Sequence, residues 1–275
     1  MVKRILVGLG DEAHAESATR YGIELAVRTD AELTGIALFD EARLSYTGSV
    51  PLGAGDFARE LREKRLLETR ELVDRLITAF ESACRESQVP ALTTIREGEP
   101  LDCLQKAARY QDIVFAGRTS LFEHGVIEEP PSALIELIQG GVRPIVTVPA
   151  EYRPIRKVIV AYSGSMGSAR TMRQFAVLRP WPDAKVQIVV FDKKEDESKS
   201  LLTDAVAYYE AHGIDVEGAY VPDPPLHSLL PYAAKWDADM IVMGNSARRY
   251  LLRKVFGETM LHAVKNSEIP LFLSQ

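Results

Sequence analysis

Short, continuous apolar runs recur along the chain, each flanked by charged residues or by glycine and proline. They lack the alternation of polar and apolar positions, which is typical of strands buried on both faces of a parallel sheet. Between these runs, apolar residues recur at helical spacing. The helical stripes are Ala18, Tyr21, Leu25 and Ala26; Leu101, Leu104, Ala107 and Ala108; and Leu226, Leu229, Leu230, Ala233 and Ala234. This alternation of strands and helices predicts an α/β protein whose parallel sheets carry helices on both faces.

The same landmarks occur twice, in the same order, along the chain. The matching segments are 3–8 and 156–161, 39–40 and 191–192, 112–117 and 239–244, and 144–148 and 270–274. A repeat of this kind indicates two copies of one domain in tandem. We therefore predict a first domain over residues 1–150 and a second over 154–275, each with a doubly wound, five-stranded parallel sheet. Pro149 and Pro154 bracket the short linker between them.

The first copy carries an insertion after its second strand, because the spacing between matching residues shortens beyond that point. Part of the insertion is the stretch 46–55, which contains glycine and proline. The rest belongs to a helix with a charged run over 59–65, which predicts a solvated helix face. Its apolar positions at helical spacing are Val73, Leu76, Ile77, Phe80 and Cys84.

Charge and composition exclude several classes of function. The formal net charge is −6, whereas sequence-independent nucleic-acid binding needs a concentrated basic surface. No uncharged apolar stretch approaches the length of a membrane span, so we expect no membrane contact and a cytoplasmic location. The five histidines lack the spacing of metal-ligating pairs, and we predict no metal site.

The candidate chemistry lies at the carboxyl ends of the first and fourth strands of each copy, where an open parallel sheet binds its ligands. In the second copy, Met243 and Gly244 end the fourth strand, and Gly257 opens the last helix. A glycine at a helix start presents free N–H groups to an anion. This pattern predicts a phosphate-binding cradle.

The strand order, the two-copy layout and this loop resemble the universal stress protein family in its tandem form. The resemblance implies a Rossmann-like fold of the adenine nucleotide alpha hydrolase type and a stress-response function. Many members bind ATP through a loop reading Gly, two residues, Gly, nine residues, Gly, then Ser or Thr, which implies ATP or AMP as the ligand of the second copy. The implied nucleotide-binding residues are Ala161, Tyr162, Ser163, Ser165, Phe191, Met243, Gly244, Ser246, Ala247, Gly257, Glu258 and Thr259.

The second copy departs from the family pattern at three positions. Ser163 stands where nucleotide-binding members have an aspartate at the adenine and ribose end. Ala247 replaces the second glycine and adds a methyl group where backbone approaches phosphate. Glu258, followed by Thr259, replaces the hydroxyl residue, and its carboxylate repels a phosphate at the helix N-terminus.

The first copy departs further from the pattern. Pro130 occupies the position of the phosphate-binding glycine, and proline has no N–H to donate. After the first strand, the segment 8–12 lacks the family aspartate at its third position and adds Asp11 and Glu12. We expect no nucleotide in the first copy.

Three functional hypotheses follow. In the first, the chain is a stress-response module without robust catalysis, whose second copy senses ATP or AMP. In the second, it is a weak nucleotide hydrolase or adenylyl-transfer enzyme that uses residues 163–168 and the Gly257 helix end. In the third, it is a ligand-free interaction scaffold. Family members pair through their final strands, so residues 145–148 and 270–274 are expected to pair within one chain. Homodimerisation of the whole chain is also possible on this pattern.

Overall fold

The computed structural model describes residues 2–41, 55–117, 134, 137–138, 140–142, 144–191, 195–244 and 257–274. These residues belong to two compact units. The first unit is Lys3–Val142 with Ala150–Tyr152. The second is Arg143–Pro149 and Arg153–Gln275, together with Met1–Val2. Each unit is an α/β layered structure, as the alternation of strands and helices predicts.

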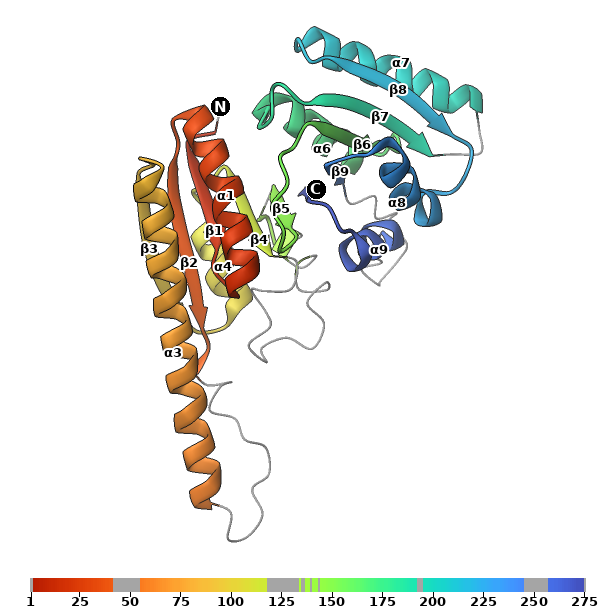
Figure 1. The fold of residues 1–275 in the computed structure, drawn as a ribbon. Coiled ribbons are helices and arrows are strands. Elements are labelled where there is room, and N and C mark those ends of the chain that lie inside the picture. Colours follow the sequence, from red (N-terminus) through yellow and green to blue (C-terminus); the bar gives the residue numbers. More distant parts are fainter. Residues whose placement is uncertain are drawn as a thin grey trace. The chain divides into compact units, whose positions relative to one another are not determined.

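The first unit is a parallel sheet with the strand order β3-β2-β1-β4 (Figure 1). Helices connect its strands, and α1 and α3 pack together. Its elements are β1 (Arg4–Gly8), α1 (Glu12–Thr29), β2 (Glu32–Phe39), α3 (Gly55–Glu86), β3 (Ala91–Glu97), α4 (Pro100–Ala108) and β4 (Ile113–Gly117).

The second unit repeats this order and adds a fifth parallel strand, giving β8-β7-β6-β9-β10. Its elements are β6 (Lys157–Ala161), α6 (Met166–Leu178), β7 (Lys185–Phe191), α7 (Glu195–Ala211), β8 (Val216–Val221), α8 (Pro225–Trp236), β9 (Met240–Gly244), α9 (Glu258–Asn266) and β10 (Leu271–Ser274). Because β6 pairs with both β7 and β9, the chain reverses its strand order at β6. The predicted fold class is confirmed.

The last strand of the first copy, β5 (Ile145–Val148), pairs with β10 in antiparallel orientation. Val146 lies opposite Phe272, and Thr147 lies opposite Leu271. The two final strands thus meet within one chain, as expected from the family resemblance. For this reason β5 belongs to the compact unit of the second copy, whereas the repeat pattern assigns it to residues 1–150.

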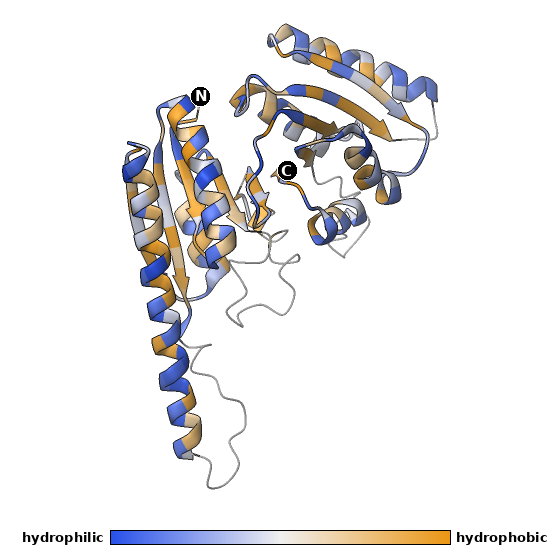
Figure 2. Ribbon diagram, in the orientation of Figure 1, coloured by the Kyte–Doolittle hydropathy of each residue, from blue (hydrophilic) through white to orange (hydrophobic). Residues whose placement is uncertain are grey.

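Burial separates the central strands from the edge strands. All residues of β4 and all but the first of β1 are buried, while β3 and β8, each with one free edge, are half-exposed. Figure 2 shows apolar residues concentrated along the strands, with hydrophilic positions spread over the helices. The largest fully buried side chains include Tyr21, Tyr209, Phe80, Phe115 and Phe272.

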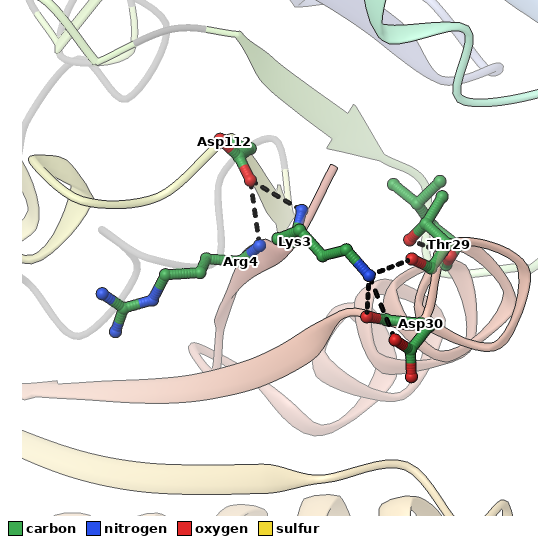
Figure 3. Close-up of polar contacts among 6 residues, drawn as sticks. Lys3, Arg4, Thr29, Asp30 and Asp112 are labelled. Atoms are coloured by element: carbon green, nitrogen blue, oxygen red, sulfur yellow. Dashed lines mark hydrogen bonds and ion pairs between the residues drawn. The ribbon is translucent and has the colours of Figure 1, made fainter. Parts of the chain in front are cut away.

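One aspartate in each copy fixes the start of the first strand against the fourth. Asp112, just before β4, accepts hydrogen bonds from the backbone N–H groups of Lys3 (2.7 Å) and Arg4 (3.0 Å) (Figure 3). Asp239, just before β9, accepts the same pair from Arg156 and Lys157, both at 2.8 Å. A carboxylate that accepts two backbone donors holds the adjacent strands in one register.

The insertion of the first copy appears as a long helix. The α3 helix has 32 residues, against 17 in α7, and runs well past the end of β2 (Figure 1). Its buried residues Val73, Leu76, Phe80 and Cys84 confirm most of the predicted stripe, whereas Ile77 is only half-buried. The charged residues of the 59–65 run are exposed, as predicted for a solvated face. Residues 46–54 of the predicted insertion lie outside the described residues.

We expect Asp239→Ala to lower the free energy of unfolding by about 1–2 kcal/mol, because two backbone N–H groups lose their acceptor. The matched control is Asp237→Asn, because Asp237 has a positive φ of 58° that asparagine tolerates, and its side chain is 91% exposed and forms only a surface ion pair with Lys157. Urea unfolding followed by circular dichroism measures both variants. Equal losses in the two variants would contradict a role of Asp239 in holding the strand register.

Candidate functional site

The candidate site is a small pocket in the second copy, at the carboxyl ends of β6 and β9. These strands are neighbours, and the starts of α6, α8 and α9 surround their ends. The pocket has a volume of about 60 Å³. Its described lining residues are Ala161, Tyr162, Ser163, Ser168, Phe191, Pro225, Met243, Gly244, Gly257, Thr259 and Met260.

Most of the residues singled out in the sequence come together here. Ser165 and Glu258 are not among the lining residues, and Ser246 and Ala247 lie outside the described residues. The remaining predicted residues all line the pocket. Sequence reasoning missed Pro225 and Met260, and it included Ser168 only in the 163–168 segment of the hydrolase alternative. Their only signal is position: Ser168 lies in the first turn of α6, Pro225 opens α8, and Met260 lies in the first turn of α9.

Gly244 is required by packing within the protein. A Cβ atom at this position would lie 2.7 Å from the carbonyl oxygen of Gly167 and 2.6 Å from Oγ1 of Thr171. Both belong to α6, so the end of β9 runs directly against that helix. The absence of a side chain therefore serves the contact between β9 and α6, and does not by itself indicate close approach of a ligand.

Three serines occupy the loop after β6 and the start of α6. The hydroxyl oxygens of Ser163, Ser165 and Ser168 lie 3.0–3.1 Å from one another. Ser165 is the N-cap of α6, and its hydroxyl accepts a hydrogen bond from the Ser168 N–H. An anion at the start of α6 would therefore have to displace a cap that the protein itself supplies.

The start of α9 differs from that of α6 because no side chain caps it within the described part of the chain. Gly257 is the N-cap, and its carbonyl oxygen accepts from the Met260 and Leu261 N–H groups. The N–H groups of Glu258 and Thr259 have no acceptor among the described residues, and the Glu258 side chain is exposed without a hydrogen bond. Because the Glu258 carboxylate makes no hydrogen bond to these amide groups, they are available to an anion.

Phe191 contributes an aromatic side chain to the pocket lining. Phe191, at the end of β7, is only 9% exposed, and its ring packs edge-on against Tyr232 of α8 at 5.9 Å. The Tyr232 hydroxyl donates to the side-chain oxygen of Gln187 at 2.9 Å. Burial, and then the nearby Glu217 carboxylate, raise the pKa of Tyr232, so this phenol stays protonated at neutral pH.

Comparison with known proteins identifies the family. The model of the Universal stress protein family matches residues 1–119 and 154–274, one match for each copy. The chain belongs to the universal stress protein family. No curated protein sequence gives a significant match.

Several solved structures are similar to this universal stress protein. One from Archaeoglobus fulgidus DSM 4304 is 15% identical over 99% of this chain and 96% of its own, with a TM-score of 0.65. A putative universal stress protein from Pseudomonas aeruginosa UCBPP-PA14 is 13% identical over 99% of this chain and 93% of its own, with a TM-score of 0.62. A shorter universal stress protein in complex with cAMP is 21% identical over 45% of this chain and 98% of its own, with a TM-score of 0.39.

We also searched the described residues of this universal stress protein for metal sites and membrane-spanning helices. In the ranges that the structure describes, no group of three His, Cys, Asp or Glu side chains is placed to hold a metal ion. No helix in those ranges is both long and apolar enough to cross a membrane.

We expect Gly244→Ala to destabilise the protein by about 2–3 kcal/mol, because the new methyl group meets the backbone of α6. Gly55→Ala is the matched control, since nothing lies within 4 Å of a Cβ atom there. That control should change stability by at most about 1 kcal/mol, in the stabilising direction. Thermal unfolding compares the two variants, and a Gly244→Ala variant as stable as the control would contradict the close contact.

Proposed function

We propose that the second copy binds ATP or AMP by its phosphate end, at the start of α9. The observation that supports this most is the pair of Glu258 and Thr259 amide groups without an acceptor in the described part of the chain. Gly257 and Thr259 line the same pocket as Ser163 and Ser168, so the start of α9 and two hydroxyl groups border one region. Such a group of donors at a helix N-terminus suits an anion.

The size of the pocket limits which part of the ligand it takes. Its volume is about 60 Å³. Pockets that enclose whole small molecules have roughly 300–1,000 Å³. The pocket therefore suits a phosphate group, and the ribose and base would lie outside it, beyond Phe191 and its partner Tyr232.

In this proposal the protein binds and signals without robust catalysis. The described lining offers serine, threonine and tyrosine hydroxyl groups and apolar side chains, with no histidine or carboxylate among them. A general base or a group that holds Mg²⁺ would be needed for nucleotide hydrolysis. The first copy then acts as a structural partner, and the whole chain as a cytoplasmic stress-response module.

A ligand-free scaffold is the second candidate function. Two observations favour it: Gly244 is explained by its contact with α6, and the Phe191 ring is covered by Tyr232. In that case the pocket keeps the geometry of a nucleotide-binding site but binds no nucleotide. Isothermal titration with ATP and AMP distinguishes the scaffold from the nucleotide-binding module, because a scaffold gives no heat of binding with either nucleotide.

We expect Glu258→Ser to strengthen ATP binding by about fivefold, because an exposed carboxylate at the helix start contributes roughly 1 kcal/mol of repulsion. The matched control is Asp196→Ser, which removes an exposed acid from the first turn of α7 and should leave affinity unchanged. Isothermal titration of both variants and the wild type with ATP and AMP measures the effect. Absence of binding heat in all three proteins would overturn the nucleotide proposal.

Phosphate release tests the hydrolase alternative. We expect no steady turnover of ATP by the wild type. Gly257→Pro is a suitable variant, because Gly257 has φ −62°, which proline adopts without strain. Steady phosphate release by the wild type that this folded variant loses would favour the enzyme over the binding module.

A further inference from the structure

A second and larger cavity lies in the first copy, in the groove between α1 and α3. Its volume of about 420 Å³ is within the roughly 300–1,000 Å³ of small-molecule sites. Ala15 and Thr19 of α1 form one wall, and Leu76, Phe80 and Ala83 of α3 form the other. This α1–α3 groove is separate from the candidate site at β6 and β9, which belongs to the second copy.

Ala83, which lines the groove, stands where the second copy has a large residue. Cys84 precedes the first residue of β3 by as many positions as Tyr209 precedes that of β8, so the two correspond, as do Ala83 and Tyr208. Tyr209 is completely buried, and its hydroxyl donates to the carbonyl oxygen of Met172 of α6 at 2.8 Å. The repeated fold thus does not itself demand a cavity next to its first helix.

The interior of the groove is apolar. Leu76, Phe80 and Ala15 are each at most 4% exposed, and Thr19 is buried too. The Thr19 hydroxyl already donates to the carbonyl oxygen of Ala15 at 2.7 Å. A ligand would therefore find apolar surface and no unsatisfied donor, so the part of it that enters the groove must itself be apolar.

The rim of the groove carries charges of both signs. Arg75 donates to Glu12 at 3.0 Å, so these two neutralise each other. Arg20 and Glu16 also lie on the rim. The Arg20 guanidinium lies over the ring of Tyr152, 4.2 Å from its centroid, and has no carboxylate within ion-pair distance among the described residues.

Tyr152 holds this guanidinium at the rim. Its hydroxyl donates to Oε2 of Glu24 at 2.8 Å, and its ring lies 4.6 Å from that of Tyr21, both on α1. Stacking covers one face of the guanidinium but leaves the N–H donors in its plane available to a carboxylate. The groove thus combines an apolar interior with one available cationic donor group at its edge.

We propose that the α1–α3 groove binds a small amphipathic anion, an apolar chain or ring system with one carboxylate, whose head group meets Arg20. The apolar part lies against Ala79 and Ala83, over the largely buried Leu76 and Phe80. Closure of a hydrophobic groove by such a molecule removes apolar surface from water, and the charge-assisted hydrogen bond to Arg20 orients it. The first copy is then a ligand-binding domain with its own site.

Isothermal titration of the full chain with sodium decanoate, below its micelle concentration, tests this proposal. The wild type should bind one decanoate per chain. Ala83→Leu fills the groove and should weaken binding at least about tenfold, whereas Ala207→Leu, on the exposed surface of α7, should not. If Ala83→Leu fails to fold, Ala79→Leu, at an exposed position of the same groove, replaces it.

A second variant tests the head group. Arg20→Gln should weaken decanoate binding about tenfold and leave decanol binding unchanged, because only the carboxylate uses the guanidinium. Asp196→Ser, in the other copy, should bind decanoate like the wild type. The proposal is overturned if several decanoates bind per chain, if the groove-filling variant binds like the wild type, or if Arg20→Gln has no effect.

Discussion

The hydrogen bonds that one aspartate per copy accepts from two backbone N–H groups are the constraint on which the site depends. Asp112 and Asp239 each lie just before the fourth strand and accept from the start of the first. They fix the register of two neighbouring parallel strands, so the carboxyl ends of those strands meet at one edge of the sheet. In the second copy that edge carries the pocket, with Ala161 on β6 and Met243 on β9.

The two copies share this fold but differ in the position of their candidate binding sites. In the second copy, Tyr209 bridges to α6 while the N-terminus of α9 stays uncapped among the described residues. In the first, Ala83 and Cys84 stand in place of the two tyrosines, and a groove opens between α1 and α3. An uncapped helix start suits phosphate, whereas an apolar groove suits an amphipathic molecule. One duplicated fold can therefore present two sites of different chemistry.

The repeat and the apolar runs were enough to predict the strands and their parallel order, because local periodicity and self-similarity determine both. The pairing of β5 with β10 was expected only from the family resemblance. The position of β5 in the second unit was not predictable from the repeat, since an antiparallel partner leaves no trace in the strand's own sequence. Motif spacing indicated Gly244 but not its reason, which is contact with Gly167 of α6. The groove at Ala83 was not predicted from the sequence. Helical periodicity indicates which face of a helix is buried, but it does not indicate whether a cavity lies beside that face.

The central claim is that the backbone amides at the start of α9 are available to phosphate, and amide chemical shifts report this most directly. In a titration of ¹⁵N-labelled protein with ATP, the account predicts saturable shifts of the Glu258 and Thr259 amide signals. The signal of Lys265, in the last turn of the same helix, should move much less. Amide signals of Glu258 and Thr259 that stay fixed up to high ATP concentration would contradict the account.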